Sequence, residues 1–163
     1  MTDEIMLLSR QLHDALASKT LTIGTAESCT GGGVAAAIVA VAGSSAYFKG
    51  GIVAYSNEVK AQLLGVSKQI ISQQTAVCEA VARQMVVGAC ERLQVDIAVS
   101  LTGIAGPGGG SADIPVGTIW IGYGSHDDIH TLCLSGDEGR SRNLERATAK
   151  ALQVLIDYIE ARY

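Results

Sequence analysis

Short segments with the apolar patterns of strands alternate with helical segments along nearly the whole chain. Strands are expected at residues 21–26, 47–55, 96–101, 116–123 and 129–134, and helices at 2–19, 31–41, 57–64, 78–93 and 144–159. This alternation predicts one α/β domain built in layers and spanning residues 1–163. A short turn at 124–128 separates the last two strands, which predicts a hairpin and therefore a mixed sheet.

The composition narrows the class of protein. The 163 residues are enough for one domain with a proper core, and 48% of them are hydrophobic. A net charge of −4 without a basic stripe argues against nucleic acid as the main partner, and the four cysteines lack the spacing of a metal knuckle. Residues 1–19 are too charged for a secretory leader, and the apolar stretch 31–43 is too short to cross a bilayer. We therefore expect a reduced cytoplasmic protein without membrane contact.

Three regions combine hydroxyl side chains with glycines or a lysine, which a core does not need. They are residues 25–32, residues 43–45 together with 55–60, and residues 102–110. Glycines allow a ligand to approach the backbone, while hydroxyls and a lysine are the components of a metal-free nucleophilic hydrolase. An enzyme that acts on a small molecule is therefore the leading interpretation.

Two of these regions supply candidate catalytic groups. Lys60 follows Tyr55 by five residues, across a strand end and a helix start, so both side chains can point into one cleft. A lysine made neutral by burial can deprotonate a serine, and a tyrosine can relay that proton or donate to an oxyanion. Ser28 lies between a strand and a helix, which suits a nucleophile or an anion clamp. An exposed lysine and an ordinary helix-capping serine remain the alternatives.

The third region follows a buried strand. Glycines and a proline crowd the eight residues after Thr102, which favours a backbone cradle for a phosphate or carboxylate over a simple turn. The alternative is a long flexible connection. Arg140, Arg142 and Arg146 lie near the start of the last helix, where one of them can reach a ligand phosphate. A solvated helix face is the alternative for the others.

Taken together, these segments resemble the CinA C-terminal domain family, whose stand-alone members are nicotinamide-nucleotide amidases of bacteria. The motifs are T-A-E-S-C-T-G-G at 25–32, A-G-S-S-A-Y-F at 42–48, Y-S-N-E-x-K at 55–60, T-G-I-A-G-P-G-G-G at 102–110, P-V-G-T-I-W at 115–120 and S-G-D at 135–137. The resemblance covers roughly residues 5–160. It implies a three-layer α/β/α sandwich with a mixed, mostly parallel sheet, assembled as a homodimer. It also implies hydrolysis of nicotinamide mononucleotide to nicotinate mononucleotide and ammonia, without metal or cofactor, by a serine–lysine mechanism.

The resemblance also assigns roles by position. It gives the nucleophile as Ser45, the proton-handling pair as Lys60 and Tyr55, supporting hydroxyls as Ser28 and Thr102, and a functional arginine as Arg142; which serine attacks stays open. Substrate contacts are expected from Thr25, Glu27, Thr30, Gly31, Gly32, Gly103, Ala105, Gly106 and Arg140. Which loop holds the phosphate and which holds the oxyanion also stays open.

Three positions depart from the family pattern. Glu138 stands where an arginine is usual, Ile114 where a lysine is frequent, and Cys78 where a serine is usual. If the two lost cations contact an anionic nucleotide, the loss of each would weaken its binding by about 1–3 kcal/mol. The alternative function is therefore a weak or inactive paralogue that acts as a nucleotide-binding or regulatory module. A role in competence or DNA damage follows from the family's historical name alone, and the acidic net charge speaks against DNA contact.

Overall fold

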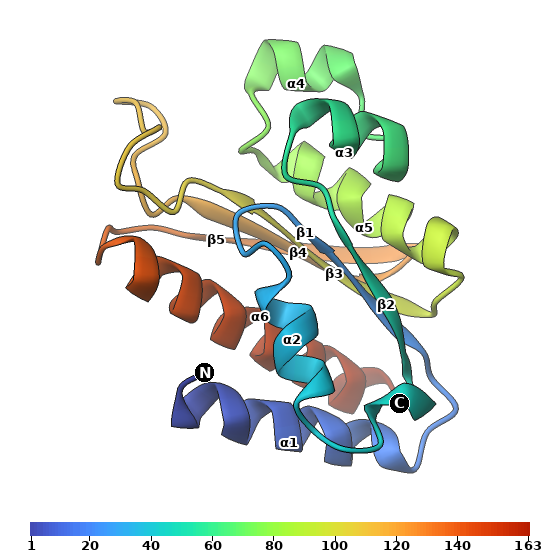
Figure 1. Cartoon of the computed structure of the whole chain (residues 1–163). Coiled ribbons are helices and arrows are strands. Elements are labelled where there is room, and N and C mark those ends of the chain that lie inside the picture. The colour runs from blue at the N-terminus through green and yellow to red at the C-terminus, as the bar shows by residue number, and fades with distance from the viewer.

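The computed structural model describes all 163 residues and contains one five-stranded sheet (Figure 1). The strands are β1 (Ile23–Glu27), β2 (Phe48–Val53), β3 (Ile97–Gly103), β4 (Ile119–Ser125) and β5 (Asp128–Leu134). Their spatial order is β2-β1-β3-β4-β5. β1 pairs in parallel with β2 and β3, whereas β4 is antiparallel to β3 and β5. The mixed sheet and its β4–β5 hairpin confirm the prediction from the sequence.

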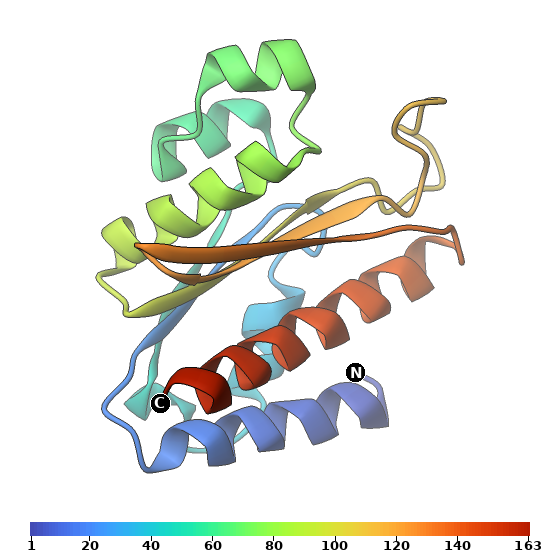
Figure 2. The same ribbon diagram turned by 180° about the vertical axis from the view of Figure 1, so that it is seen from behind.

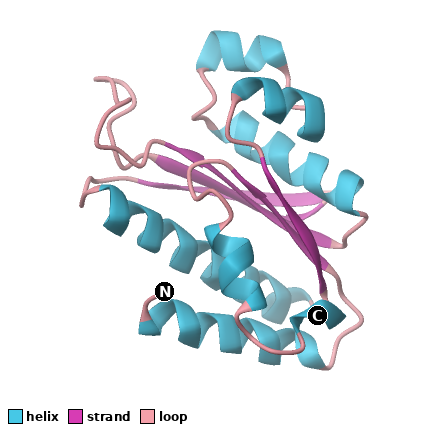
Figure 3. Ribbon diagram, viewed as in Figure 1, coloured by secondary structure: helices cyan, strands magenta, loops and turns pink.

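Helices cover both faces of the sheet and give three layers (Figures 2 and 3). One face carries α1 (Asp3–Ala17), α2 (Gly33–Val39) and α6 (Arg140–Arg162), which pack on one another. The other face carries α5 (Glu79–Leu93), over which lie α3 (Asn57–Leu64) and α4 (Lys68–Gln74) (Figure 1). The arrangement confirms the three-layer α/β/α sandwich. None of these helices combines the length and the apolar character needed to span a bilayer.

The two faces of the sheet have cores of different character. The core under α1, α2 and α6 contains 25 buried apolar residues, and the core under α5 contains 11. The smaller core shares its face with buried hydroxyls: Ser100 donates to the carbonyl of Ala82 at 2.7 Å, and Thr102 donates to the carbonyl of Ala76 at 2.7 Å. Both hydroxyls belong to β3 and face the α5 side of the sheet.

One helix is missing from the prediction, and β4 and α6 begin three and four residues away from the expected positions. α4 has no counterpart in the prediction because none of its residues is buried, so its sequence shows no apolar period. β4 begins at Ile119 because Gly117 and Thr118 instead bond to Ile104, with N–O distances of 2.8 and 2.9 Å. α6 begins four residues earlier than expected, at Arg140, since its first turn is polar on the surface.

Candidate functional site

Ser28 and Lys60 meet at the carboxyl ends of the parallel strands. Ser28 follows β1, and Lys60 lies in α3, which follows β2. The Lys60 Nζ atom lies 3.0 Å from the Ser28 Oγ atom, and the two residues are only 2% and 7% exposed. In open α/β sheets this edge, where neighbouring connections leave on opposite faces, is the usual place for a ligand. The contact brings a potential base to a potential nucleophile.

The Lys60 amine is surrounded by neutral oxygen atoms. Besides Ser28 Oγ, it contacts the carbonyl oxygens of Ala54 at 3.0 Å and Tyr55 at 3.3 Å. No carboxylate forms an ion pair with it. Burial lowers the pKa of Lys60 below its ordinary value, and the opposing influences of Cys29 and Glu58 are smaller. Burial therefore raises the fraction of the neutral amine relative to an exposed lysine, and the neutral amine is the form that can accept a proton.

The local sequence places Lys60 in this position. Ser56 caps α3, because its hydroxyl accepts the Val59 N–H at 3.2 Å. The Ala54 N–H donates to the Glu27 carbonyl at 2.8 Å and so fixes the end of β2 beside the end of β1. The first turn of α3 then points Lys60 back toward Ser28.

Cys29 is a second potential nucleophile directly after Ser28. It is 8% exposed, and burial raises the pKa of its thiol to about 11. Since the thiolate is the reactive form of cysteine, this thiol is held in its inert form. The contact with the Lys60 amine and the inert thiol of Cys29 together make Ser28 the better candidate nucleophile of the two.

Glu27 organises the loop that carries Ser28. Its carboxylate accepts the Thr30 hydroxyl at 2.6 Å and the N–H groups of Gly32, Val34 and Ala35 at 3.1, 3.0 and 2.8 Å. An anion at the start of α2 satisfies free N–H groups and complements the helix dipole. Glu27 is 1% exposed, so it acts here as a cap.

The remaining residues of this first loop differ in exposure. Thr25 is fully buried within β1, and its hydroxyl has no hydrogen-bond partner. Gly31 is exposed and Gly32 half-buried, and both have the positive φ angles, 59° and 102°, that favour glycine. Thr30, Gly31 and Gly32 therefore form the solvent-facing part of the loop.

Thr102 lies beside Ser28 on the same face of the sheet. Leu101 pairs with Glu27, and the Ser28 N–H donates to the Leu101 carbonyl at 2.9 Å, which places the next residue of β3 next to Ser28. Thr102 is 1% exposed and donates to Ala76, so it connects β3 with the segment between α4 and α5. The structure thus brings Ser28, Lys60 and Thr102 together.

The glycine-rich loop after β3 is anchored at its base by α6. Arg140 donates to the carbonyl of Gly106 at 2.8 Å, and Asn143 donates to the carbonyl of Ala105 at 3.1 Å. Gly106 has a φ angle of 88°, and a Cβ atom there would lie 2.6 Å from a methyl carbon of Val116. The first part of the loop, from Gly103 to Gly106, therefore has a defined shape.

Asn143 is a site residue that the sequence analysis missed. It is fully buried, also donates to Asp137 Oδ1 at 2.8 Å, and accepts the Glu138 N–H at 3.1 Å. The only available signal was an amide side chain near the start of a helix, and such residues are usually exposed.

Three expected catalytic residues lie outside this cluster. Ser45 is exposed in the short 3-10 helix η1 (Ser44–Ala46), at the start of β2, whereas Lys60 follows its end. A six-residue strand between them spans about 20 Å. Tyr55 offers Lys60 its carbonyl, but its side chain is directed to solvent and the residue is 62% exposed. Arg142 is exposed on α6, where its guanidinium lies 3.5 Å from Glu138 and 3.4 Å from Glu145.

The positions that depart from the family pattern lie around the same loops. Glu138 pairs with Arg146 at 2.8 Å. Ile114 is half-buried in the glycine-rich loop, and its N–H donates to the Ser111 hydroxyl at 3.1 Å. Cys78 occupies the N-cap position of α5 without a side-chain capping bond. No group of three His, Cys, Asp or Glu side chains lies close enough together to form a metal site.

Comparisons with known proteins identify relatives that share the sequence and the fold. Nicotinamide-nucleotide amidohydrolase PncC of Escherichia coli K12 is 48% identical over 159 residues, which cover 95% of each chain. A CinA-like protein of Chlorobium limicola is 46% identical over 152 residues, which span 89% of this chain and 35% of that longer protein. Among solved structures, competence/damage inducible protein CihA of Agrobacterium tumefaciens superposes with a TM-score of 0.94 at 37% identity, covering 97% of each chain.

A CinA superfamily protein of Klebsiella pneumoniae superposes with a TM-score of 0.92 at 30% identity, covering 96% of this chain and 98% of that one. The family model of the CinA C-terminal domain matches residues 6–159, which is nearly the whole chain. The chain therefore belongs to the CinA C-terminal domain family.

Proposed function

We propose that this protein hydrolyses the carboxamide of nicotinamide mononucleotide to give nicotinate mononucleotide and ammonia, with Ser28 as nucleophile and Lys60 as base. Two findings support the proposal. Relatives that match along their whole length are named nicotinamide-nucleotide amidohydrolases. The Lys60 amine lies 3.0 Å from the Ser28 hydroxyl in a buried site, and this contact is the observation that carries the mechanism.

The three contacts of Lys60 suit an ammonium, which donates to all three oxygens, as well as the neutral amine that the mechanism uses. A neutral lysine has two N–H bonds and one lone pair. The carbonyls of Ala54 and Tyr55 can accept only hydrogen, so they take the two N–H bonds. In the neutral form the lone pair is left for the Ser28 hydroxyl, which then donates to it, whereas the ammonium form donates to Ser28 Oγ. The two carbonyls therefore orient the base toward the nucleophile.

The reaction follows from this orientation in two steps. Ser28 Oγ attacks the carboxamide carbon while Lys60 takes the hydroxyl proton, and Lys60 then gives this proton to the departing nitrogen, which leaves as ammonia. Water, deprotonated by Lys60, attacks the acyl-serine and releases the carboxylate, and the proton returns to Ser28. The Cys29 and Thr30 N–H groups donate to no oxygen of the protein, and we assign them to the oxyanion.

The other site residues take supporting roles in this proposal. Thr102 holds the α4–α5 connection beside Ser28, and Glu27 holds the loop that carries it. Thr30, Gly31, Gly103, Ala105 and Gly106 border the cluster and are proposed to contact the nucleotide. Thr25, Gly32 and Arg140 shape the same two loops.

We further propose that the protein works as a homodimer in the cytoplasm. Ser45 and Arg142 lie apart from Lys60 within one chain, so a role for them next to the substrate requires a second copy. A purely nucleotide-binding or regulatory function is less well supported, because the buried amine–hydroxyl contact is intact.

The test is ammonia release from nicotinamide mononucleotide by the purified protein and three variants. We expect Ser28→Ala and Lys60→Ala to lose at least about a thousandfold in kcat while keeping the wild-type circular dichroism spectrum. Ser45→Ala removes the other candidate nucleophile, and the proposal expects this variant to keep wild-type turnover. A Ser28→Ala variant with wild-type turnover would refute the assigned nucleophile, and a folded wild type without turnover would favour the binding-module function.

A further inference from the structure

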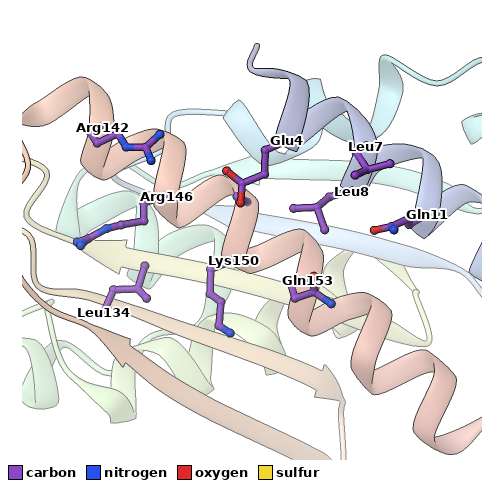
Figure 4. Close-up of a pocket in the computed structure, with 10 residues that line it drawn as sticks. Glu4, Leu7, Leu8, Gln11, Leu134, Arg142, Arg146, Lys150 and Gln153 are labelled. Atoms are coloured by element: carbon purple, nitrogen blue, oxygen red, sulfur yellow. The ribbon is translucent and has the colours of Figure 1, made fainter.

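A hollow of about 520 Å³ lies between α1, α6 and the end of β5 (Figure 4). Leu7, Leu8, Leu134 and Ala149 form its apolar walls. α1 and α6 cover the face of the sheet opposite α3, so the hollow is separate from the Ser28–Lys60 site, and none of Ser28, Lys60 and Thr102 lines it. Its volume suits a small organic ligand.

Three cations line one side of this hollow. Arg142, Arg146 and Lys150 follow one another at intervals of four residues on α6, so they lie on one face of the helix (Figure 4). Glu4, from α1, is the only carboxylate among the residues that line it. Just outside the lining, Glu138 and Glu145 pair with Arg142 and Arg146, so Lys150 is the cation without a carboxylate partner. The hollow therefore favours an anionic group.

The cations are available to a ligand to different degrees. Lys150 forms no hydrogen bond and no ion pair with the protein. The contacts of Arg142 with Glu138 and Glu145 are long, at 3.5 and 3.4 Å, and these side chains are 41–55% exposed. Exposed pairs of this kind are worth little, so an incoming anion can replace them.

Arg146 is held more firmly than the other two cations. One of its nitrogen atoms donates to the Gly136 carbonyl at 2.7 Å, and another pairs with Glu138 at 2.8 Å. It therefore presents a positioned guanidinium that need not be ordered when an anion binds.

The opposite end of the same groove has the opposite charge. Past Gln11 and Gln153, which line both parts, a second hollow of about 470 Å³ is bordered by Asp14, Asp157 and Glu160. Along α6, the seven residues from Lys150 to Asp157 span about 10 Å. A ligand with a second anionic group at that distance would meet these carboxylates and be repelled.

We propose that the hollow at Arg142, Arg146 and Lys150 is a second ligand site, which takes a phosphate monoester with an uncharged organic remainder. The phosphate would accept from the cations, and the remainder would lie against Leu7 and Leu134. This inference uses no group of the Ser28–Lys60 cluster, and of its three cations only Arg142 also has a proposed role beside the substrate, through a second copy of the chain.

An NMR titration of the ¹⁵N-labelled protein with adenosine monophosphate tests the site, since each amide reports its own location. Inorganic phosphate and adenosine are the matched probes for the charge alone and the organic part alone. We expect adenosine monophosphate to shift the amides of Leu7, Gln11, Leu134 and Lys150 at lower concentration than either probe. Shifts confined to residues 28–32 and 102–106, or equally strong binding of adenosine, would overturn the proposal.

Charge variants should change the affinity for adenosine monophosphate in opposite directions. Lys150→Ala and Lys150→Gln should weaken the binding of adenosine monophosphate about tenfold, which corresponds to one charge-assisted hydrogen bond. Glu138→Gln should strengthen it, because the variant removes the carboxylate that competes for Arg142 and Arg146. Lys49→Ala, on the exposed part of β2, removes the same charge elsewhere and should bind as the wild type does. Equal affinities of the Lys150 and Lys49 variants would contradict the site.

Discussion

The Lys60 amine lies 3.0 Å from the Ser28 hydroxyl, and no carboxylate balances its charge. This relationship predicts how activity depends on pH. Burial lowers the pKa of Lys60, and only the neutral amine can accept the Ser28 proton. Below that pKa the amine is protonated, so kcat/KM should rise tenfold per pH unit and level off above it, at a pH below the ordinary lysine value of 10.5.

Lys60→Arg extends the same test. A guanidinium stays protonated at every accessible pH, so the variant should remain inactive across the profile although it keeps the charge. A rise of activity with pH in Lys60→Arg would show that another group is the base.

Glu27→Gln should destabilise the protein and slow turnover together. The amide keeps the shape of the carboxylate but turns one N–H₂ group toward the donors of Thr30, Gly32, Val34 and Ala35. We expect a loss of about 2 kcal/mol in the free energy of unfolding, measured by urea denaturation. Glu160→Gln, an exposed change of the same kind, is the control and should stay within about 0.5 kcal/mol of the wild type. Equal stabilities would show that Glu27 does not hold the loop.

Asn143→Leu should cost about 2–4 kcal/mol of stability, because the Ala105 carbonyl and the Glu138 N–H lose their partner inside the protein. The loop after β3 should loosen, and KM should rise more than kcat falls. Thermal unfolding and steady-state kinetics measure the two effects. Ser141→Ala, exposed on the same turn of α6, should change neither, and an Asn143→Leu enzyme with unchanged KM would separate this anchor from substrate binding.

The four cysteines should differ in their reaction with iodoacetamide at pH 8. Cys133 is exposed and Cys78 half-buried, whereas burial raises the pKa values of Cys29 and Cys90 to about 11. Mass spectrometry of the folded protein should find Cys133 modified first, and Cys29 and Cys90 only after unfolding. Cys29→Ala should also retain activity, in contrast to Ser28→Ala. If the two variants were equally inactive, the thiol would have to be reconsidered as nucleophile.

The sequence predicted elements well where burial imposes a period. The strands of the parallel half and the hairpin have clear apolar patterns, and all lie near their expected positions, with the start of β4 shifted by three residues. α4 has no buried residue, so no periodic signal exists to find it. The start of α6 was missed because its first turn is fixed by contacts with residues 105 and 106, which are more than 30 positions away in the chain.

The sequence analysis named Ser28, Lys60 and Thr102 as candidates, but it could not show how the candidate residues are arranged in space. Local reasoning placed Lys60 and Tyr55 side by side in one cleft, but the helical turn directs one side chain inward and leaves the other in solvent. Local reasoning favoured Ser28 and the family resemblance favoured Ser45, so the sequence left open which serine attacks. Only the pairing of β1 with β2 shows that Ser28 lies at the same end of the sheet as Lys60 and that Ser45 lies at the other.

The unequal cores on the two faces of the sheet have a practical consequence for protein engineering. The apolar layer beneath α1 and α6 contains neither Ser28 nor Lys60, so its side chains other than Cys29 and Ala105 can be repacked for heat resistance without touching the groups assigned to the site. The α3–α5 layer offers no such freedom, since it contains the buried amine and the hydroxyls that we propose for turnover. Random libraries should accordingly yield their thermostable members on one side of the sheet and their rate-altered members on the other.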